Sequence, residues 1–308
     1  MTAFRAFGDE RKRASLIADI DAKGPIYAAW LTRESVAGDI SLVSDDYGLH
    51  PAFARLLPCL GAFGEAEDAR PFYGSLFDAI PTGADTGALA REAVLLAWTD
   101  PTYGRSKIVP QGAVREACEG VVALVRQSID APVDRKAWRA ARTRLLASAS
   151  GDAGLEKTVD LMMSLAWDLD QAPGAAQDVM VAWTAGINAE ADASDEDAFS
   201  LEEGERFEIE MNKINEEAME ALAQSRSMDS IGVEEFLEVV DRIWVADPVR
   251  NDLRRRSRAR RERSNAKMAV WRAAIQKRVL EIADRSFAQR TDIMPEGVPP
   301  ETLDLSGI

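Results

Sequence analysis

The pattern of apolar and polar residues along the chain is that of a helical protein. Apolar residues recur every three or four positions, and glycine and proline separate the segments that show this period. Only 40–43 alternates in the manner of a strand, which is too short to predict a sheet. The predicted fold class is therefore all-α. In the first part of the chain the predicted helices are 9–23, 26–37, 51–60, 69–80, 86–98, 155–169 and 175–187, with two more around the apolar stripes at 114–125 and 138–146.

Two polar residues stand where predicted helices begin. The hydroxyl of Thr86 is placed to accept the free amide hydrogens in the first turn of the following helix. His50, the only histidine of the chain, precedes Pro51, and proline is favoured at the first helical position. No nucleophile near His50 stands in a strained turn, so we interpret this histidine as a helix-start residue and not as a catalytic base.

Beyond residue 200 the pattern changes to longer helices. Ser200 and Glu203 have the spacing of a capping box, in which each side chain accepts a hydrogen bond from the other residue's backbone. Apolar residues from Phe207 to Leu222 then follow at nearly coiled-coil spacing. A second helix is predicted to begin at Val233.

The third C-terminal helix is expected to be unusually long. Asp247 can cap it, Pro248 suits its first position, and neither glycine nor proline interrupts it before about Gln289. Its later half carries Trp271 among apolar residues at core-facing spacing. We therefore expect this indole ring to be buried.

These helices group into a multi-helix globular domain and a C-terminal helical arm or bundle with one long basic helix. The predicted bounds are 1–187 for the globular domain, 188–200 for an acidic linker, 201–294 for the arm and 295–308 for an extended or disordered tail.

The composition predicts a folded cytoplasmic protein. Hydrophobic residues make up 46% of the 308 residues, and no apolar run has the length of a signal peptide or a membrane span, so we expect no membrane contact. Cys59 and Cys118 lack the spacing of a disulfide framework or a metal site, so we interpret both as buried free thiols. The excess of arginine over lysine favours a bacterial or phage origin.

Several short motifs imitate known sites without their context. The segment around Glu235 resembles the end of a calcium-binding loop, but its register would place an arginine and a methionine among the ligands. Tyr103 and Lys107 have the spacing of a dehydrogenase pair, yet no glycine-rich turn precedes them to hold a dinucleotide. Acidic pairs such as Asp168 and Asp170, read as helical neighbours, do not share a face that could hold magnesium. We predict no catalytic, metal or cofactor site.

The strongest signal is the distribution of charge. Between 250 and 290, fourteen basic residues against four acidic ones give +10, whereas the whole chain carries −15, so the remainder sums to −25. The arginines surround the start of the long helix, where the helix dipole disfavours cations, so some anion should compensate. The residues predicted to contact a partner or a nucleic acid are Arg254, Arg255, Arg258, Arg261 and Arg263.

Three sources of that anion stay open. Glutamates between 202 and 210 would lie beside the arginines if the first and third C-terminal helices are parallel. An acidic protein partner and the phosphates of a nucleic acid are the other two sources.

The predicted function is that of a non-enzymatic helical adaptor or assembly subunit, which binds a protein partner or forms a homo-oligomer. The alternative is a nucleic-acid-binding regulator that uses the basic helix from Arg254 to Arg263, although no helix-turn-helix and few interleaved aromatic residues accompany it. An enzyme of an unrecognised helical type is a second alternative.

Overall fold

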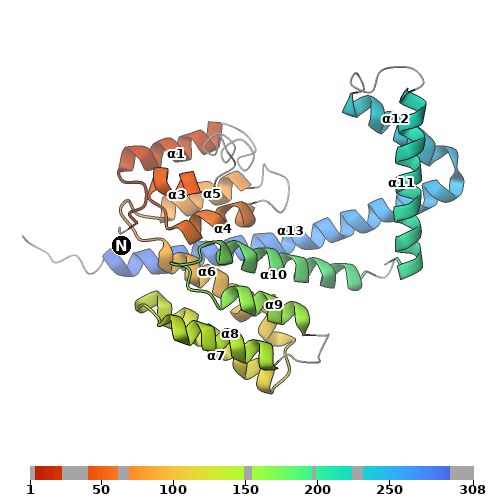
Figure 1. Ribbon diagram of the computed structural model, residues 1–308. Helices are drawn as coiled ribbons and strands as arrows, with labels where there is room; N and C mark the ends of the chain where they lie inside the picture. The colour runs from red at the N-terminus through yellow and green to blue at the C-terminus, as the bar shows by residue number, and fades with distance from the viewer. Residues whose placement is uncertain are drawn as a thin grey trace, which may run out of the picture. The chain divides into compact units, whose positions relative to one another are not determined.

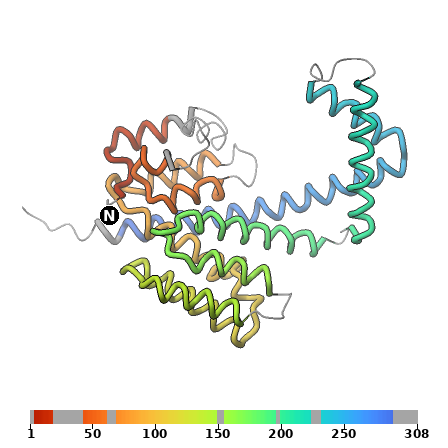
Figure 2. Tube along the Cα trace, viewed as in Figure 1, coloured from red at the N-terminus to blue at the C-terminus, as the bar shows by residue number. Residues whose placement is uncertain are grey.

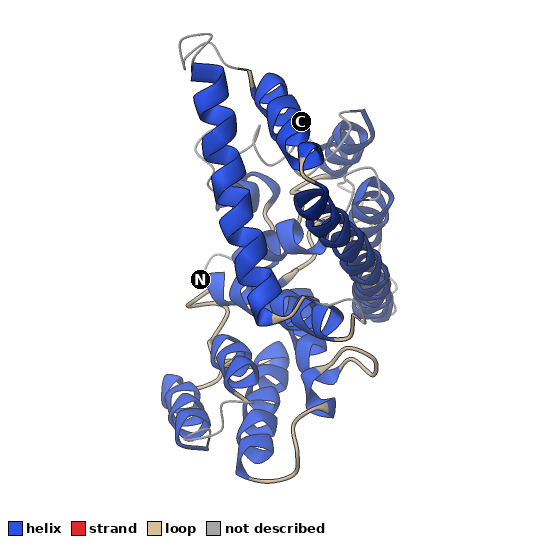
Figure 3. Cartoon of the chain, turned by 90° about the vertical axis from the view of Figure 1, so that its right-hand side faces the viewer, coloured by secondary structure: helices blue, strands red, loops and turns tan. Residues whose placement is uncertain are grey.

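The computed structural model describes residues 4–22, 41–61, 69–148, 155–195, 199–223 and 232–291. Within these ranges every regular element is helical and no strand occurs (Figure 1, Figure 3), which confirms the predicted all-α class. The helix predicted at 26–37 and the tail predicted at 295–308 lie outside the described residues.

The chain forms two compact units. Unit 1 consists of Met1–Ala185 and Trp271–Ile308, and unit 2 consists of Gly186–Val270. The last part of the long helix thus groups with the N-terminal helices, whereas the sequence suggested a separate arm from 201 to 294. Unit 1 contains α1 (Glu10–Ala22), α3 (Ser41–Tyr47), α4 (Pro51–Gly61), α5 (Ala69–Ala79), α6 (Gly87–Thr99), the short 3-10 helix η2 (Arg105–Lys107), α7 (Ala113–Asp130), α8 (Arg135–Ser148) and α9 (Glu156–Leu165).

Unit 2 contains α11 (Leu201–Ala223) and α12 (Val233–Ala246). Two helices belong partly to each unit, namely α10 (Gly174–Ala193) and α13 (Pro248–Thr291). The end of α10 corrects a predicted bound, because the helix continues six residues past the expected end at 187 and into the predicted linker.

The core of unit 1 contains side chains of N-terminal helices such as α4 and α5 and of the last part of α13, which is drawn in blue in Figure 2. Phe53 and Leu56 of α4 are fully buried, and the hydroxyl of Tyr73 on α5 donates a hydrogen bond to a backbone carbonyl of α4. From α13, the side-chain amide of Gln276 donates to the carbonyl oxygen of Leu60 at 2.9 Å. This hydrogen bond ties the C-terminal helix to α4 across most of the sequence.

Unit 2 is built on the packing of α11 against α12. The buried residues Ile214 and Ala218 on α11 meet Val240 and Trp244 on α12, and the ring of Phe207 stacks on that of Trp244 at 5.7 Å. The two helices run in roughly opposite directions (Figure 1, Figure 3).

The predicted helix starts in unit 2 are confirmed. The backbone amide of Ser200 donates to the carboxylate of Glu203 at 3.0 Å, and the amide of Glu203 donates to the Ser200 hydroxyl at 3.1 Å, which is a capping box. The carboxylate of Asp247 accepts from the amides of Val249 and Arg250, so it caps α13 as expected. From there α13 runs for 44 residues without interruption.

The predicted cap of α6 is wrong in its acceptor. The hydroxyl of Thr86 makes no capping hydrogen bond and instead accepts from the backbone amide of His50 at 2.9 Å. The first turn of α6 is satisfied by Asp85, whose carboxylate accepts from the amide of Gly87 at 2.8 Å. Of the strand-like segment 40–43, residues 41–43 are helical, since α3 begins at Ser41, and residue 40 lies outside the described residues.

Candidate functional site

An apolar groove of about 660 Å³ lies in unit 2 between α11, α12 and the first part of α13. Phe207 and Met211 of α11 line it together with Leu237, Val240 and Trp244 of α12. These side chains join the small core of unit 2, so the groove is an opening into that core and its shape is fixed by packed helices. We call it the unit 2 groove.

The two walls of the unit 2 groove carry opposite charges. Glu234, Glu238 and Asp241 line it from α12, and Arg254, Arg258 and Arg261 line it from α13. Within each row the residues are four and then three positions apart, which places them along one side of their helix. An apolar floor between an acidic and a basic wall suits a helix that is itself apolar on one face.

Most arginines at the start of α13 are paired with acidic residues of unit 2. Arg250 reaches Glu217 at 3.1 Å and also Glu210 at 2.9 Å. Arg263 meets both carboxylate oxygens of Asp195 at 3.0 Å. The remaining pairs between helices join Arg254 and Arg258 to Asp241, Arg256 to Glu203 and Arg260 to Asp192.

The five predicted contact residues therefore fall into two groups. Arg254 is paired with Asp241 of α12 and Arg263 with Asp195, two residues past the end of α10, and Arg254 also lies over the ring of Trp244. Arg255 pairs only with Asp252 on its own helix and its side chain is 76% exposed. Arg258 is 62% exposed and lies 3.5 Å from Asp241, while Arg261 has no polar partner among the described residues. Arg255, Arg258 and Arg261 are thus the arginines left available to a ligand.

The direction of α13 against α11 differs from the predicted one. As residue numbers rise on α13 from Arg250 to Arg256, their partners on α11 fall from Glu217 to Glu203, so the two helices run in opposite senses. The parallel arrangement expected from the sequence would have grouped the glutamates from 202 to 210 beside the cluster. Two of these glutamates, Glu203 and Glu210, nevertheless pair with Arg256 and Arg250, and the other neutralising acids are spread over α10, α11 and α12.

These pairs change the acidity of their members. The hydrogen bond from Arg256, helped by that from the Ser200 amide, holds the pKa of Glu203 below its usual value. Hydrogen bonding to Glu217 raises the pKa of Arg250. Burial, together with the neighbouring charge of Arg258, lowers the pKa of Arg254. Within the basic wall of the groove, Arg254 is thus the partly desolvated arginine.

We predict that the paired arginines stabilise unit 2 and that the exposed ones do not. A variant with Arg250, Arg256 and Arg263 changed to Gln should lose about 1–3 kcal/mol of unfolding free energy, since each partly exposed pair contributes up to about 1 kcal/mol. Hydrogen exchange of α11 to α13 at low and high salt measures the loss, which should shrink as salt screens the charges.

The matched control for this prediction removes the same number of charges from the available group. The change of Arg255, Arg258 and Arg261 to Gln should leave hydrogen exchange in unit 2 within about 0.5 kcal/mol of the wild type. An equal loss in both variants would mean that general charge balance, and not these ion pairs, stabilises the unit.

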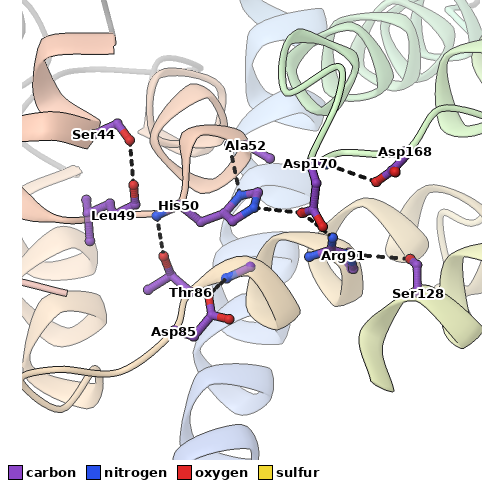
Figure 4. Close-up of polar contacts among 11 residues, drawn as sticks. Ser44, Leu49, His50, Ala52, Asp85, Thr86, Arg91, Ser128, Asp168 and Asp170 are labelled. Carbon is purple, nitrogen blue, oxygen red and sulfur yellow. Dashed lines mark hydrogen bonds and ion pairs between the residues drawn. The ribbon is translucent and has the colours of Figure 1, made fainter. Parts of the chain in front are cut away.

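A second polar cluster lies in unit 1 around the buried side chains of His50 and Arg91 (Figure 4). Its Nε2 atom lies 2.9 Å from a carboxylate oxygen of Asp170, and that same oxygen accepts from the guanidinium of Arg91. Arg91 also donates to the hydroxyl of Ser128 at 3.2 Å. The cluster joins the start of α4, the helices α6 and α7, and the turn between α9 and α10.

The hydrogen bonds of His50 define its tautomer and its role. Its Nδ1 atom accepts from the backbone amide of Ala52 at 3.2 Å, so the proton lies on Nε2, where it is donated to Asp170. Neither ring nitrogen is left to take a proton from a substrate. The predicted helix-start role is therefore confirmed, with His50 capping α4 through its side chain.

Asp168 lies next to this cluster and orders the turn that carries Asp170. The carboxylate of Asp168 accepts from the amide of Asp170 at 3.0 Å, in a turn and not on a helix as the sequence suggested. Within the described part of the chain, no group of three or more acidic, histidine or cysteine side chains is placed to hold a metal ion. Burial raises the pKa of Cys59 to about 11 and that of Cys118 to about 12, so both stay protonated as unreactive free thiols.

The sequence analysis missed Arg91 and considered Asp170 only as part of an acidic pair with Asp168. Arg91 is 6% exposed and stands in the middle of the apolar segment that forms α6. A single charge inside such a segment is a signal that a buried partner exists. Asp170 gives no such signal, because it lies 120 positions from His50 in an acidic chain.

Comparisons with protein-family models, with curated proteins and with solved structures found no match to this chain. Among the helices that the structure describes, none combines the length and the apolar character needed to span a bilayer.

Proposed function

We propose that the chain is a non-enzymatic helical adaptor or assembly subunit, and that it binds a protein through the unit 2 groove. The distribution of exposed apolar side chains carries this proposal. Of the twelve large apolar side chains exposed in the described residues, eight belong to unit 2, although it is the smaller unit. These eight are Leu201, Ile209, Met219, Val233, Leu237, Val245, Val249 and Val270.

Of these eight residues, Leu237 lines the unit 2 groove. Apolar side chains gathered at an open groove, with charged residues around them, are typical of protein interaction sites. Leu237 lines the groove and remains 55% exposed, so a bound helix would remove it from water. The aromatic floor of Phe207 and Trp244 offers the large contact area that binding hot spots require.

A photo-crosslinking residue at position 237 of the full-length protein tests the proposal. We expect illumination to join it to a protein that mass spectrometry identifies, and we expect a further change of Val233 to Lys to suppress that product. A crosslinker at Leu146, which is similarly exposed on α8, is the matched control. Equal products from both positions, or none from position 237, would contradict the proposed binding surface.

The nucleic-acid alternative retains one observation in its favour. Arg255, Arg258 and Arg261 are not neutralised by acids on other helices as fully as their neighbours are. If they bind phosphates, their change to Gln should make the log-log salt dependence of duplex binding shallower by about 3 units. Absence of duplex and single-strand binding by the wild type at low salt would end this alternative.

A further inference from the structure

We infer that the occupant of the unit 2 groove is α12 of a second copy of this chain, so that two copies insert their α12 helices into one another's grooves. This inference rests on the proposed function and names its partner. It is carried by the charges of the groove walls and by the exposed edge of α12.

The walls of the groove are complementary to themselves under a two-fold axis. In a symmetric dimer every contact occurs twice. If one residue of the first copy contacts another residue of the second copy, the same two residues also meet with the copies exchanged. The acidic pair Glu234 and Glu238 of one copy can therefore face the basic pair Arg258 and Arg261 of the other, twice over. The acidic pair is four residues apart, slightly more than one helical turn, and the basic pair is three apart, slightly less, so long side chains have to span a difference in rise of only about 1.5 Å.

The charged groups that would pair between copies are mainly those that form no ion pair within their own copy. Among the described residues, Glu234, Glu238 and Arg261 form no ion pair, and Arg258 shares Asp241 with Arg254. Charges that line an apolar groove without partners are costly to cover with an apolar ligand. A second copy supplies a charge of opposite sign to each wall.

The exposed edge of α12 has the character of the missing occupant. Val233 is 75% and Leu237 55% exposed, and both lie with Glu234 and Glu238 within about 140° of the helix circumference. This edge would bring apolar side chains to the floor formed by Phe207 and Trp244 and carboxylates to the basic wall. An unrelated partner would need an acidic row to face the basic wall and a basic row to face the acidic wall. A second copy of this chain already carries both rows, one on α12 and one on α13.

Reciprocal charge reversal tests the inference with full-length protein. One variant changes Glu234 and Glu238 to Lys, and the other changes Arg258 and Arg261 to Glu. Size-exclusion chromatography with light scattering at low salt should show a wild-type dimer and should show each variant alone to self-associate at least about 100-fold more weakly, because like charges then face one another. An equimolar mixture should restore a dimer, since both contacts then join opposite charges.

The controls separate this inference from simple misfolding and from the proposed function. The change of Glu216 and Glu220 to Lys on the exposed side of α11 reverses two charges outside the groove and should leave the dimer intact. The milder change of Glu234 and Glu238 to Gln should weaken the dimer without repulsion, which covers a failure of the Lys variant to fold.

Two results would overturn the inference. One is a wild type that stays monomeric at every concentration tested, and the other is a mixture of folded variants that fails to associate. If a position 237 crosslink to a different protein accompanies a monomeric wild type, the proposed adaptor function stands and only the second copy is rejected. If position 237 captures nothing, both fail together.

Discussion

Replacing Trp271 by alanine should lower the unfolding free energy of unit 1 by about 3–5 kcal/mol, the range for removal of a fully buried large aromatic side chain. Trp271 is 1% exposed, and its ring lies edge-on to that of the fully buried Trp183 at 5.5 Å. Alanine would leave a cavity beside Trp183 and would also remove the edge-to-face attraction of the two rings. Denaturant unfolding followed by circular dichroism measures the loss.

A second tryptophan provides the control for this experiment. Trp167 is 44% exposed, and the guanidinium of Arg142 lies 3.8 Å from the centre of its ring. Its change to alanine should cost about 1 kcal/mol or less, because an exposed cation–π contact contributes no more than that. Similar losses for both variants would show that burial of Trp271 does not determine the stability of unit 1.

Local signals explain which parts of the fold the sequence predicts. The capping box at Ser200 and Glu203, the cap at Asp247 and the uninterrupted helix from Pro248 involve residues within a few positions of one another. Their hydrogen bonds follow from the backbone geometry of a single helix end. The burial of Trp271 also follows from a local pattern, because its apolar neighbours recur at helical spacing.

The contacts between helices could not be predicted from the sequence and are seen only in the structure. The sequence predicts the arginine cluster and its need for anions. The pairing of Arg256 with Glu203 depends on the direction of α13 against α11, and that of Arg263 with Asp195 depends on where α10 ends. Either direction buries the apolar stripes of these helices, so the hydrophobic pattern does not distinguish them. The pairing of His50 with Asp170 is likewise set by how α4 and the α9–α10 turn meet, which no residue near either one encodes.

Thr86 shows how a local rule can be overridden. Its type and position favour a capping role, yet its buried hydroxyl satisfies the backbone amide of His50, which would otherwise lack a partner in the core. Asp85 is one residue earlier and reaches the α6 amide in its place. The tertiary need for a hydrogen-bond acceptor therefore outweighed the local preference.

Changing Arg91 to methionine, which keeps most of the side-chain volume, should destabilise unit 1 by about 2–3 kcal/mol at neutral pH. Arg91 donates to Asp170 and Ser128 from a buried position, and hydrogen bonds to charged groups contribute about 1.5–3 kcal/mol. The variant leaves the Asp170 carboxylate with His50 as its remaining side-chain partner. Equilibrium unfolding of wild type and variant gives the difference.

The pH dependence of that difference identifies Asp170 as its source. The hydrogen bond from His50, followed by the hydrogen bond and charge of Arg91, lowers the pKa of Asp170 from 3.8 to about 2. A carboxyl group whose pKa is lower in the folded state stabilises the fold above its unfolded pKa and loses that contribution as pH falls through the folded value. The difference in unfolding free energy between wild type and Arg91→Met should therefore be full above about pH 4 and should narrow towards pH 2.

The change of the exposed Asp160 to Asn is the control, and it should leave the dependence of the wild-type unfolding free energy on pH unaltered. A gap that stays constant from pH 7 to pH 2 would mean that Arg91 stabilises unit 1 through packing alone, since only an interaction with the ionised carboxylate disappears when Asp170 takes up its proton.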